Sequence, residues 1–253
     1  MFNGLLPSNI NIFATTAANS TESSYACYYD DERETYLGDV YSVNWLEDSD
    51  RALLSRETLQ QQYKTVSKKT NTSHVKEFGD LTISNLHVSQ FQGSKRPLLS
   101  QIEHNTIDPL EDAVPSGDVP LAIAQKKLAN SKDEIQWKLN SKNYENILKS
   151  RNFLVSSMKN FLHNITIDYP VDSIWNQRQT LVNHDCYLKI LQKFDEHCFD
   201  LSTHQYALRY LYVFVNLCES LDENENEIAE KWVYQMVKHC QSHVAGHQFG
   251  RIL

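Results

Sequence analysis

The sequence predicts an α/β domain followed by an all-α helical bundle. Three observations support this fold class: short β-branched or alternating apolar segments before residue 96, a stretch rich in proline and acidic residues after it, and apolar residues at helical spacing beyond residue 120. The predicted boundaries are 1–96 for the α/β domain, 97–130 for a linker and 131–253 for the bundle. With 41% hydrophobic and 11% aromatic residues, the 253-residue chain can bury such cores.

Strands and a helix are predicted in the first part of the chain. Residues 11–16 form a short β-branched run, which predicts a buried strand suited to a parallel sheet. Apolar residues at helical spacing predict an amphipathic helix over 53–66. Alternation at period two over 81–88 predicts another strand.

The second part of the chain is predicted to be helical. Pro97, Pro109, Pro115 and Gly117 interrupt any periodicity between residues 97 and 117, which is typical of a linker. Beyond it, apolar spacing and the scarcity of helix breakers predict a series of helices. Their expected ranges are 119–130, 132–165 as one long helix or a kinked pair, 174–182, 185–199, 203–220 and 225–240.

Composition and charge exclude several classes of protein. The net charge of −8 comes from 32 acidic and 24 basic residues without a basic stripe, so no nucleic-acid partner is expected. No apolar run approaches the ~18 residues of a membrane helix, so no membrane association is expected. The N-terminal residues 1–7 lack a basic leader and a long apolar stretch, so no secretory signal is predicted in this sequence.

Several sequence blocks occur in a specific order along the chain. The blocks are Thr15-Thr16-Ala17-Ala18-Asn19-Ser20-Thr21-Glu22-Ser23-Ser24-Tyr25-Ala26, Tyr36-Leu37-Gly38-Asp39, Tyr41-Ser42-Val43-Asn44-Trp45-Leu46-Glu47-Asp48-Ser49-Asp50, Thr70-Asn71-Thr72-Ser73-His74-Val75, Gln90-Phe91-Gln92-Gly93 and Asp118-Val119-Pro120-Leu121. A series of blocks in one order is more specific than one short motif. These blocks resemble the legumain family, the asparaginyl endopeptidases with a caspase-like fold.

The resemblance implies both an architecture and an activity. It implies the C-terminal part of a caspase-like domain, then a death-domain-like helical prodomain, and it implies cleavage after Asn in the lysosome without a cofactor. In the family, the catalytic histidine and cysteine precede the signature that begins at Thr15, so this sequence is expected to be a truncated form that lacks both and is inactive alone. The alternative is an inactive binding or inhibitory module that acts through the bundle, with full-length legumain as its partner.

Three residues are expected to bind substrate. In legumains, the positions that match Ser24, Tyr25 and Asp39 line the pocket for the Asn side chain. The chemistry fits, because a carboxylate can accept a hydrogen bond from the carboxamide nitrogen. Without the resemblance, Ser24 and Asp39 would be interpreted as loop residues that cap local backbone.

Cleavage of the chain itself is expected after Asn130. The segment Lys126-Lys127-Leu128-Ala129-Asn130-Ser131 is similar to the place where legumains are cut to separate peptidase and prodomain. The alternative interpretation of Asn130 is a polar residue at a helix end. Asp112 and Asp118 are weaker candidates for cuts at acid pH.

The cysteines predict disulfides more than metal binding. Cys186, Cys198, Cys218 and Cys240 lack the Cys-x-x-Cys spacing of zinc sites, and the sequence alone leaves three pairings open. The resemblance implies Cys186 with Cys218 and Cys198 with Cys240. Cys27 is left over and is interpreted as a buried free thiol.

Histidines and glycosylation sequons remain. His239, His243 and His247 have the spacing of one helical face, but a zinc site would need the helix to continue past Gly246, so no metal is expected. The histidines are instead interpreted as groups that titrate when the prodomain leaves its peptidase on acidification. Three sequons begin at Asn19, Asn71 and Asn164, with Asn71 favoured because it lies in a matched block; the full-length protein is therefore expected in the secretory route to the lysosome.

Overall fold

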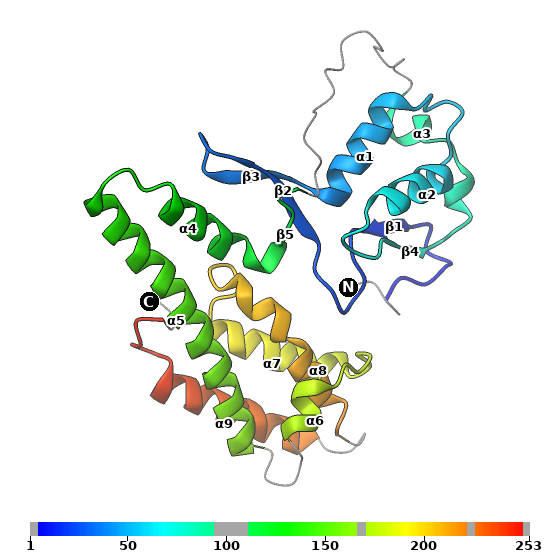
Figure 1. The fold of residues 1–253 in the computed structure, drawn as a ribbon. Helices are drawn as coiled ribbons and strands as arrows, with labels where there is room; N and C mark the ends of the chain where they lie inside the picture. The colour runs from blue at the N-terminus through cyan, green and yellow to red at the C-terminus, as the bar shows by residue number, and fades with distance from the viewer. Residues whose placement is uncertain (1–4, 94–110, 166–170, 222–225, 250–253) are drawn as a thin grey trace. The chain divides into compact units, whose positions relative to one another are not determined.

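The computed structural model describes residues 5–93, 111–165, 171–221 and 226–249. These residues form two compact units, 1–123 and 124–253, and Figure 1 shows the elements of each. Residues 97–110 of the predicted linker, including Pro97 and Pro109, lie outside the described residues, as does Thr166 of the third sequon. In the described part of the chain, no helix is long and apolar enough to cross a membrane.

The described residues of the first unit form two small sheets and the helices α1, α2 and α3. Both sheets are antiparallel: one pairs β1 with β4, and the other has the order β3-β2-β5. The bounds are β1 Phe13–Thr16, β2 Tyr25–Asp30, β3 Thr35–Asp39, α1 Val40–Arg51, α2 Leu59–Lys69, β4 Lys76–Gly79, η1 Ile83–Asn85, α3 Ser89–Gln92, β5 Val114–Pro115 and η2 Ser116–Asp118.

The prediction of a parallel sheet around residues 11–16 was wrong. The strand exists as β1, but β4 runs back along it in antiparallel register, with Phe13 opposite Gly79 and Thr16 opposite Lys76. Gly79 permits this approach, because a Cβ there would lie 2.1 Å from the carbonyl oxygen of Ile12 and its φ is +86°.

Two further predictions in this unit need correction. Residues 81–88 form no strand, because Asp80 accepts hydrogen bonds from the backbone nitrogen and the hydroxyl of Thr82 and so begins a turn into η1. The helix predicted over 53–66 begins later, at Leu59, where Thr58 and Gln61 form a capping box. Neither correction changes the prediction of an α/β domain.

Helices α1 and α2 pack through an apolar core crossed by polar bonds. Val40 and Val66 are each 1% exposed. The Trp45 indole donates to Gln62 Oε1 at 3.0 Å, and Gln62 Nε2 donates to the Ser49 hydroxyl at 3.0 Å. These bonds satisfy polar groups that would otherwise be costly to bury.

Two carboxyl groups meet at the end of this helix pair. Asp48 of α1 is 7% exposed, and one carboxyl oxygen of Asp48 and one of Glu57 are buried and accept no hydrogen bond from the backbone. Burial, and then the neighbouring Asp48 carboxylate, raises the pKa of Glu57 to about 7. Burial also raises the pKa of Asp48, while Lys69 and Arg51 oppose that shift. One shared proton therefore stabilises the pair.

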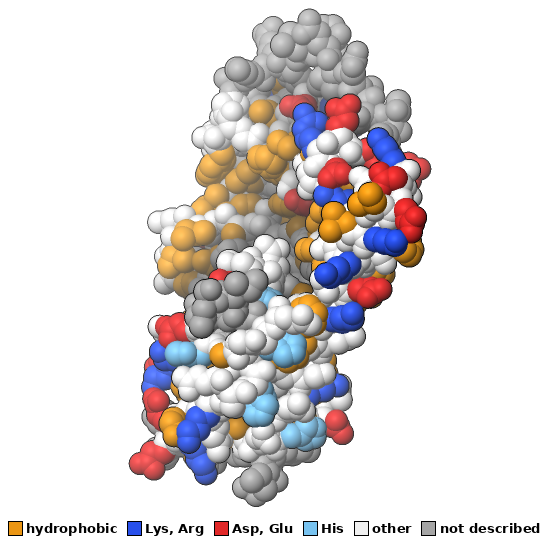
Figure 2. Space-filling model, turned by 90° about the vertical axis from the view of Figure 1, so that its left-hand side faces the viewer, with side chains coloured by type: hydrophobic (Ala, Val, Ile, Leu, Met, Phe, Trp, Pro, Cys, Tyr) orange, Lys and Arg blue, Asp and Glu red, His pale blue; other side chains and the backbone are white. Residues whose placement is uncertain are grey.

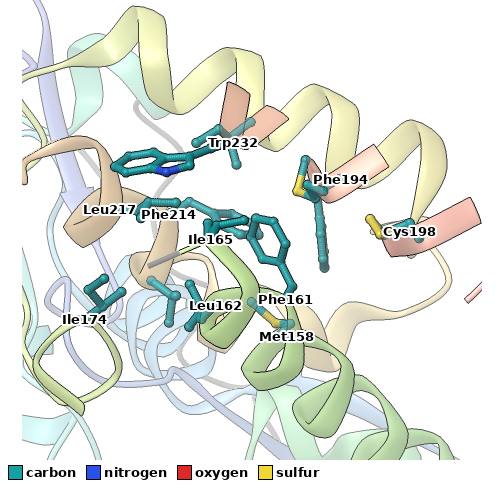
Figure 3. Close-up of a cluster of buried hydrophobic side chains, with 14 of the residues drawn as sticks. Met158, Phe161, Leu162, Ile165, Ile174, Phe194, Cys198, Phe214, Leu217 and Trp232 are labelled. Atoms are coloured by element: carbon teal, nitrogen blue, oxygen red, sulfur yellow. A yellow bond between two sulfur atoms is a disulfide. The ribbon is translucent and has the colours of Figure 1, made fainter. Parts of the chain in front are cut away.

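The second unit is a helical bundle with a single apolar core. Its elements are α4 Val119–Ala129, which begins in the first unit, α5 Glu134–Ile165, α6 Val171–Asn176, α7 His184–His197, η3 Gln205–Tyr210, α8 Tyr212–Cys218 and α9 Asn226–His243. Figure 3 shows α5, α7, α8 and α9 contributing side chains to this core. Its large members include Leu154, Met158, Phe161, Leu162, Ile190, Phe194, Phe214, Leu217, Trp232 and Met236.

The long helix predicted over 132–165 is confirmed as one helix, α5, whereas the helix predicted over 174–182 was wrong beyond Asn176. Asn216 explains the difference, because its buried amide donates to the carbonyl oxygens of Ile174 and Gln177 at 2.7 and 2.8 Å. Its Oδ1 accepts from the backbone nitrogen of Gln179 at 3.0 Å. The Asn216 side chain thus supplies hydrogen bonds to backbone groups that would be paired with each other if the helix continued.

Two disulfides join the helices of the bundle. Cys186 of α7 is bonded to Cys218 of α8, and Cys198 is bonded to Cys240 of α9. These are the pairs that the family resemblance implied. The bonds close loops with sequence separations of 32 and 42 residues, which restricts the unfolded chain.

We expect removal of the Cys198–Cys240 bond to destabilise the bundle by about 2–5 kcal/mol. The paired changes Cys198→Ala and Cys240→Ala are compared with Cys27→Ala, which removes a buried but unbonded thiol from the first unit. Chemical denaturation followed by tryptophan fluorescence measures the effect in variants that carry Trp45→Phe, so that the remaining tryptophans all lie in the second unit. An unchanged midpoint in the double variant would show that packing alone holds the bundle.

We expect the first unit to lose stability as pH rises. The folded pKa of Glu57 is raised, so its contribution is complete below the ordinary carboxyl pKa of 4.5 and disappears as pH passes about 7. Glu57→Gln keeps a donor beside Asp48 and should reduce the loss between about pH 5 and pH 8 by on the order of 1–2 kcal/mol, after allowance for solvent screening. Unfolding of wild type, Glu57→Gln and the exposed control Asp50→Asn checks this; equal pH slopes in all three would refute it.

Candidate functional site

The three predicted pocket residues lie at one end of the β2–β3 hairpin. Ser24 precedes β2, Tyr25 is its first residue, and Asp39 is the last residue of β3. The antiparallel register places Asp39 opposite Ala26. The structure therefore brings these residues together, although the blocks that carry them are separated in the sequence.

Asp39 also begins helix α1. Its Oδ1 accepts from the backbone nitrogen of Ser42 at 3.0 Å, and its Oδ2 accepts from the Ser42 hydroxyl at 2.7 Å. This is the N-cap arrangement that short acidic residues favour. A carboxylate has about four lone-pair directions, so Asp39 keeps acceptor capacity beside these two bonds.

Ser24 contacts a segment that sequence reasoning assigned to the linker. Its hydroxyl lies 2.8 Å from the Ser116 hydroxyl, and its carbonyl oxygen accepts from the Ser116 backbone nitrogen and hydroxyl, both at 2.9 Å. Strand β5 continues this contact by pairing Pro115 with Tyr25 and Val114 with Ala26. The one local signal for this edge strand was a β-branched residue beside a proline.

A network of hydrogen bonds fixes the signature loop that leads into Ser24. Glu22 accepts from the backbone nitrogens of Asn19 and His74 at 2.9 and 2.7 Å, and its second oxygen lies 2.8 Å from His74 Nδ1. Partial burial opposes ionisation, but these hydrogen bonds hold the pKa of Glu22 below its ordinary value. The Ser73 hydroxyl donates to the Ala17 carbonyl at 2.6 Å.

Cys27 is a buried thiol beside the site, as the sequence predicted. Burial, followed by the negative charges of Asp112 and Asp39, raises its pKa to about 12. The thiol is therefore protonated at neutral pH, and a nucleophile would need the thiolate. Cys27 does not have the chemistry of a catalytic cysteine.

A partly open cavity of about 460 Å³ lies elsewhere in the first unit. Tyr41, Trp45, Tyr63 and Phe91 are among the residues that line it, and Ser24, Tyr25 and Asp39 are not. Its walls are mostly apolar, whereas a carboxamide side chain needs convergent polar groups. This cavity is thus not the predicted pocket.

The three spaced histidines of the bundle do not converge. His239 lies 3.0 Å through Nε2 from the Ser157 hydroxyl and stacks on His243, whereas His247 stacks on Phe153. Helix α9 ends at His243, before Gly246 with its φ of +79°. Within the described ranges, no group of three or more potential ligands is placed to hold a metal ion.

His239 is the histidine with the most unusual surroundings. It is 8% exposed, and its Nδ1 is buried without a hydrogen-bond partner. Burial, and then the nearby His243, lowers the pKa of His239. On the face drawn in Figure 2, other histidine side chains gather over the bundle.

Asn130 lies in an exposed turn between α4 and α5. Its backbone nitrogen still donates to Lys126 at 2.9 Å, so it follows directly on the helix. On the other side, Asp133 begins α5 by accepting from the Gln136 backbone nitrogen at 2.8 Å. Asp118 ends η2, and Asp112 contacts β2.

The three sequon asparagines occupy different settings. Asn71 is exposed in the loop before β4, and Asn164 is exposed in the last turn of α5. Asn19 is half-buried, and its Oδ1 accepts from the backbone nitrogen and hydroxyl of Thr21 at 2.8 and 2.9 Å.

Comparison with known proteins gives two consecutive family matches. The profile described as "Peptidase C13 family" matches residues 1–94, and the profile described as "Legumain, prodomain" matches residues 142–245. The first covers the β2–β3 hairpin and the signature loop, and the second covers the disulfide-bonded helices.

Similar proteins come from distant organisms. Legumain of Homo sapiens is 46% identical over 217 residues, which are 85% of this chain and 50% of that protein. Hemoglobinase of Schistosoma mansoni is 35% identical over 79% of this chain and 46% of its own length. Vacuolar-processing enzyme beta-isozyme 1 of Oryza sativa subsp. indica is 31% identical over 87% and 48%. The chain spans about half the length of these curated relatives, and it belongs to the legumain family.

Proposed function

We propose that the chain is part of a cysteine endopeptidase that cleaves proteins and peptides after Asn. The observation that carries this proposal is the meeting of Ser24, Tyr25 and Asp39 at one end of the hairpin, in a chain of the legumain family. Ser24 offers a donor and an acceptor, and Asp39 offers acceptors, which matches the donors and the oxygen of a carboxamide.

The thiol chemistry must come from residues other than the described cysteines. Cys27 is buried with a raised pKa, and the four cysteines of the bundle are in disulfides. We place the catalytic histidine and cysteine outside these 253 residues, which fits relatives of about twice this length. The full-length protein is assigned to the secretory route and the lysosome, where disulfides and glycans are compatible.

A second candidate is a catalytically inactive module that binds a full-length legumain. It is favoured by the bundle, which has its own closed core and both disulfides within one unit. Adding the 253-residue chain to an active legumain-family endopeptidase separates the candidates. Saturable inhibition of the endopeptidase by the chain would support the binding module. Undiminished endopeptidase activity in the presence of excess chain would rule that module out.

We expect the longest natural form of the protein to cleave peptides after Asn, and Ser24→Ala to lower kcat/KM about tenfold, as expected for one lost hydrogen bond. The exposed Ser55→Ala change is the control. The N-terminal peptide of the endogenous protein is sequenced in parallel. No cleavage by a form that contains the upstream histidine and cysteine would refute the proposal.

We expect an active legumain-family endopeptidase to cut the 253-residue chain between Asn130 and Ser131 at acid pH, because this turn is exposed between two helices. Asn130→Ala should slow this cut at least about tenfold, since the pocket would lose its polar partner. The control Asn143→Ala alters an exposed asparagine within α5. Mass spectrometry identifies the products. If Asn130→Ala is cut as fast as wild type, Asn130 is a polar residue at a helix end and not the cleavage site.

We expect Asn71 to carry an N-linked glycan when the protein passes through the secretory route, since it is exposed in a loop. Asn71→Gln should lower the mass by one glycan, as seen after glycosidase treatment. Asn85→Gln, an asparagine outside any sequon, is the control. An unchanged mass in Asn71→Gln would exclude this site.

A further inference from the structure

The segment 112–116 lies along one edge of β2. Pro115 pairs with Tyr25 and Val114 with Ala26 in antiparallel register, and beyond these two pairs the Asp112 side chain bonds to the backbone of Tyr28 and Tyr29. At the other end, Ser116 bonds to Ser24 through its backbone and its hydroxyl. The segment therefore contacts β2 from Ser24, just before the strand begins, to Tyr28 near its middle.

At the Tyr28 end, a side chain takes the place of the backbone partner. Asp112 Oδ1 accepts from the Tyr28 backbone nitrogen at 2.9 Å, and Oδ2 accepts from the Tyr29 backbone nitrogen at 2.5 Å. Both carboxylate oxygens are used on consecutive N–H groups. Hydrogen bonds to a charged acceptor are about twice as strong as neutral ones.

These two hydrogen bonds lie where β2 departs from ordinary strand geometry. Tyr28 has a φ of +59°, in the left-handed region that a tyrosine seldom adopts. Its neighbours Cys27 and Tyr29 still pair with β3, opposite Gly38 and Tyr36. Such a conformation persists when surrounding contacts fix it, and Asp112 provides two of those contacts.

The charge of Asp112 also acts on two acidic side chains of the hairpin, Cys27 and Tyr36. It is among the charges that act on the Cys27 thiol and the Tyr36 hydroxyl, and burial with the Asp112 charge raises the pKa of both groups. The Tyr36 hydroxyl is buried without a hydrogen-bond partner. The carboxylate is thus held among weak acids that stay protonated, and it directs its oxygens to the β2 backbone.

We propose that Asp112 is a positioning residue for the substrate pocket: together with Ser116 it fixes the path of β2, and so the orientation of Ser24 and Tyr25 toward an Asn side chain. This inference rests on the proposed function. It assigns part of the linker to the peptidase unit, since 112–116 completes the sheet that carries the pocket.

The test uses Asp112→Asn, which keeps the side-chain size but removes the charge and one acceptor oxygen. Its matched control is Glu111→Gln, which removes one negative charge from the adjacent exposed residue. Hydrogen exchange on the 253-residue chain measures protection of the Tyr28 and Tyr29 amides. Peptides with Asn or Gln before the scissile bond are assayed on the longest natural form of the protein.

We expect Asp112→Asn to speed exchange of both amides by roughly tenfold to a hundredfold, in line with the loss of charged hydrogen bonds. The preference for Asn over Gln should fall several-fold, and Glu111→Gln should change neither result. Unchanged exchange of the Tyr28 and Tyr29 amides in Asp112→Asn would refute the inference that Asp112 fixes the β2 backbone. Faster exchange with an unchanged Asn preference makes Asp112 a structural residue only and overturns positioning. Absence of Asn cleavage by wild type overturns the proposed function instead, and exchange then decides alone whether Asp112 holds β2.

Discussion

Strand β2 needs hydrogen-bond partners along both of its edges, and the arrangement of the first unit follows from how they are supplied. Strand β3 covers one edge over nearly the whole length of β2. Among the described residues, the other edge is covered by the two paired residues of β5, extended by Ser116 and by the carboxylate of Asp112. An uncovered edge would invite pairing with another chain. The predicted pocket residues Ser24, Tyr25 and Asp39 lie at the end of β2 where β3 and β5 both pair with it.

Glu57 and His239 contribute to the stability of the two units with opposite pH dependence. The folded pKa of Glu57 is raised, so protonation favours the first unit as pH falls. The folded pKa of His239 is lowered, so the stability that neutral His239 gives the bundle is present at higher pH and is lost as pH falls. Ser157, Phe161 and His243 surround this imidazole, and none of them offers a negative charge. Through these two groups alone, acidification favours the first unit and disfavours the bundle.

Sequence reasoning succeeded where local pattern decides structure. The long helix α5 was predicted because helix breakers are almost absent from it, and the disulfide pairs followed from the family resemblance. It failed where contacts distant in sequence decide. Asp112 binds Tyr28 across 84 residues, and Asn216 ends a helix across 42 residues by bonding to Ile174. Ser24, Tyr25 and Asp39 could be named from the resemblance, but their supports in 112–116 could not.

The two disulfides interlace along the chain, since Cys198 lies inside the loop that Cys186 and Cys218 close. Cys186 and Cys198 are synthesised before either native partner, so oxidation at that stage would join two cysteines that the folded protein does not pair. The native pairs then require thiol–disulfide exchange, or reduced thiols until α9 has been made. A compartment that catalyses disulfide exchange therefore favours correct joining of the bundle.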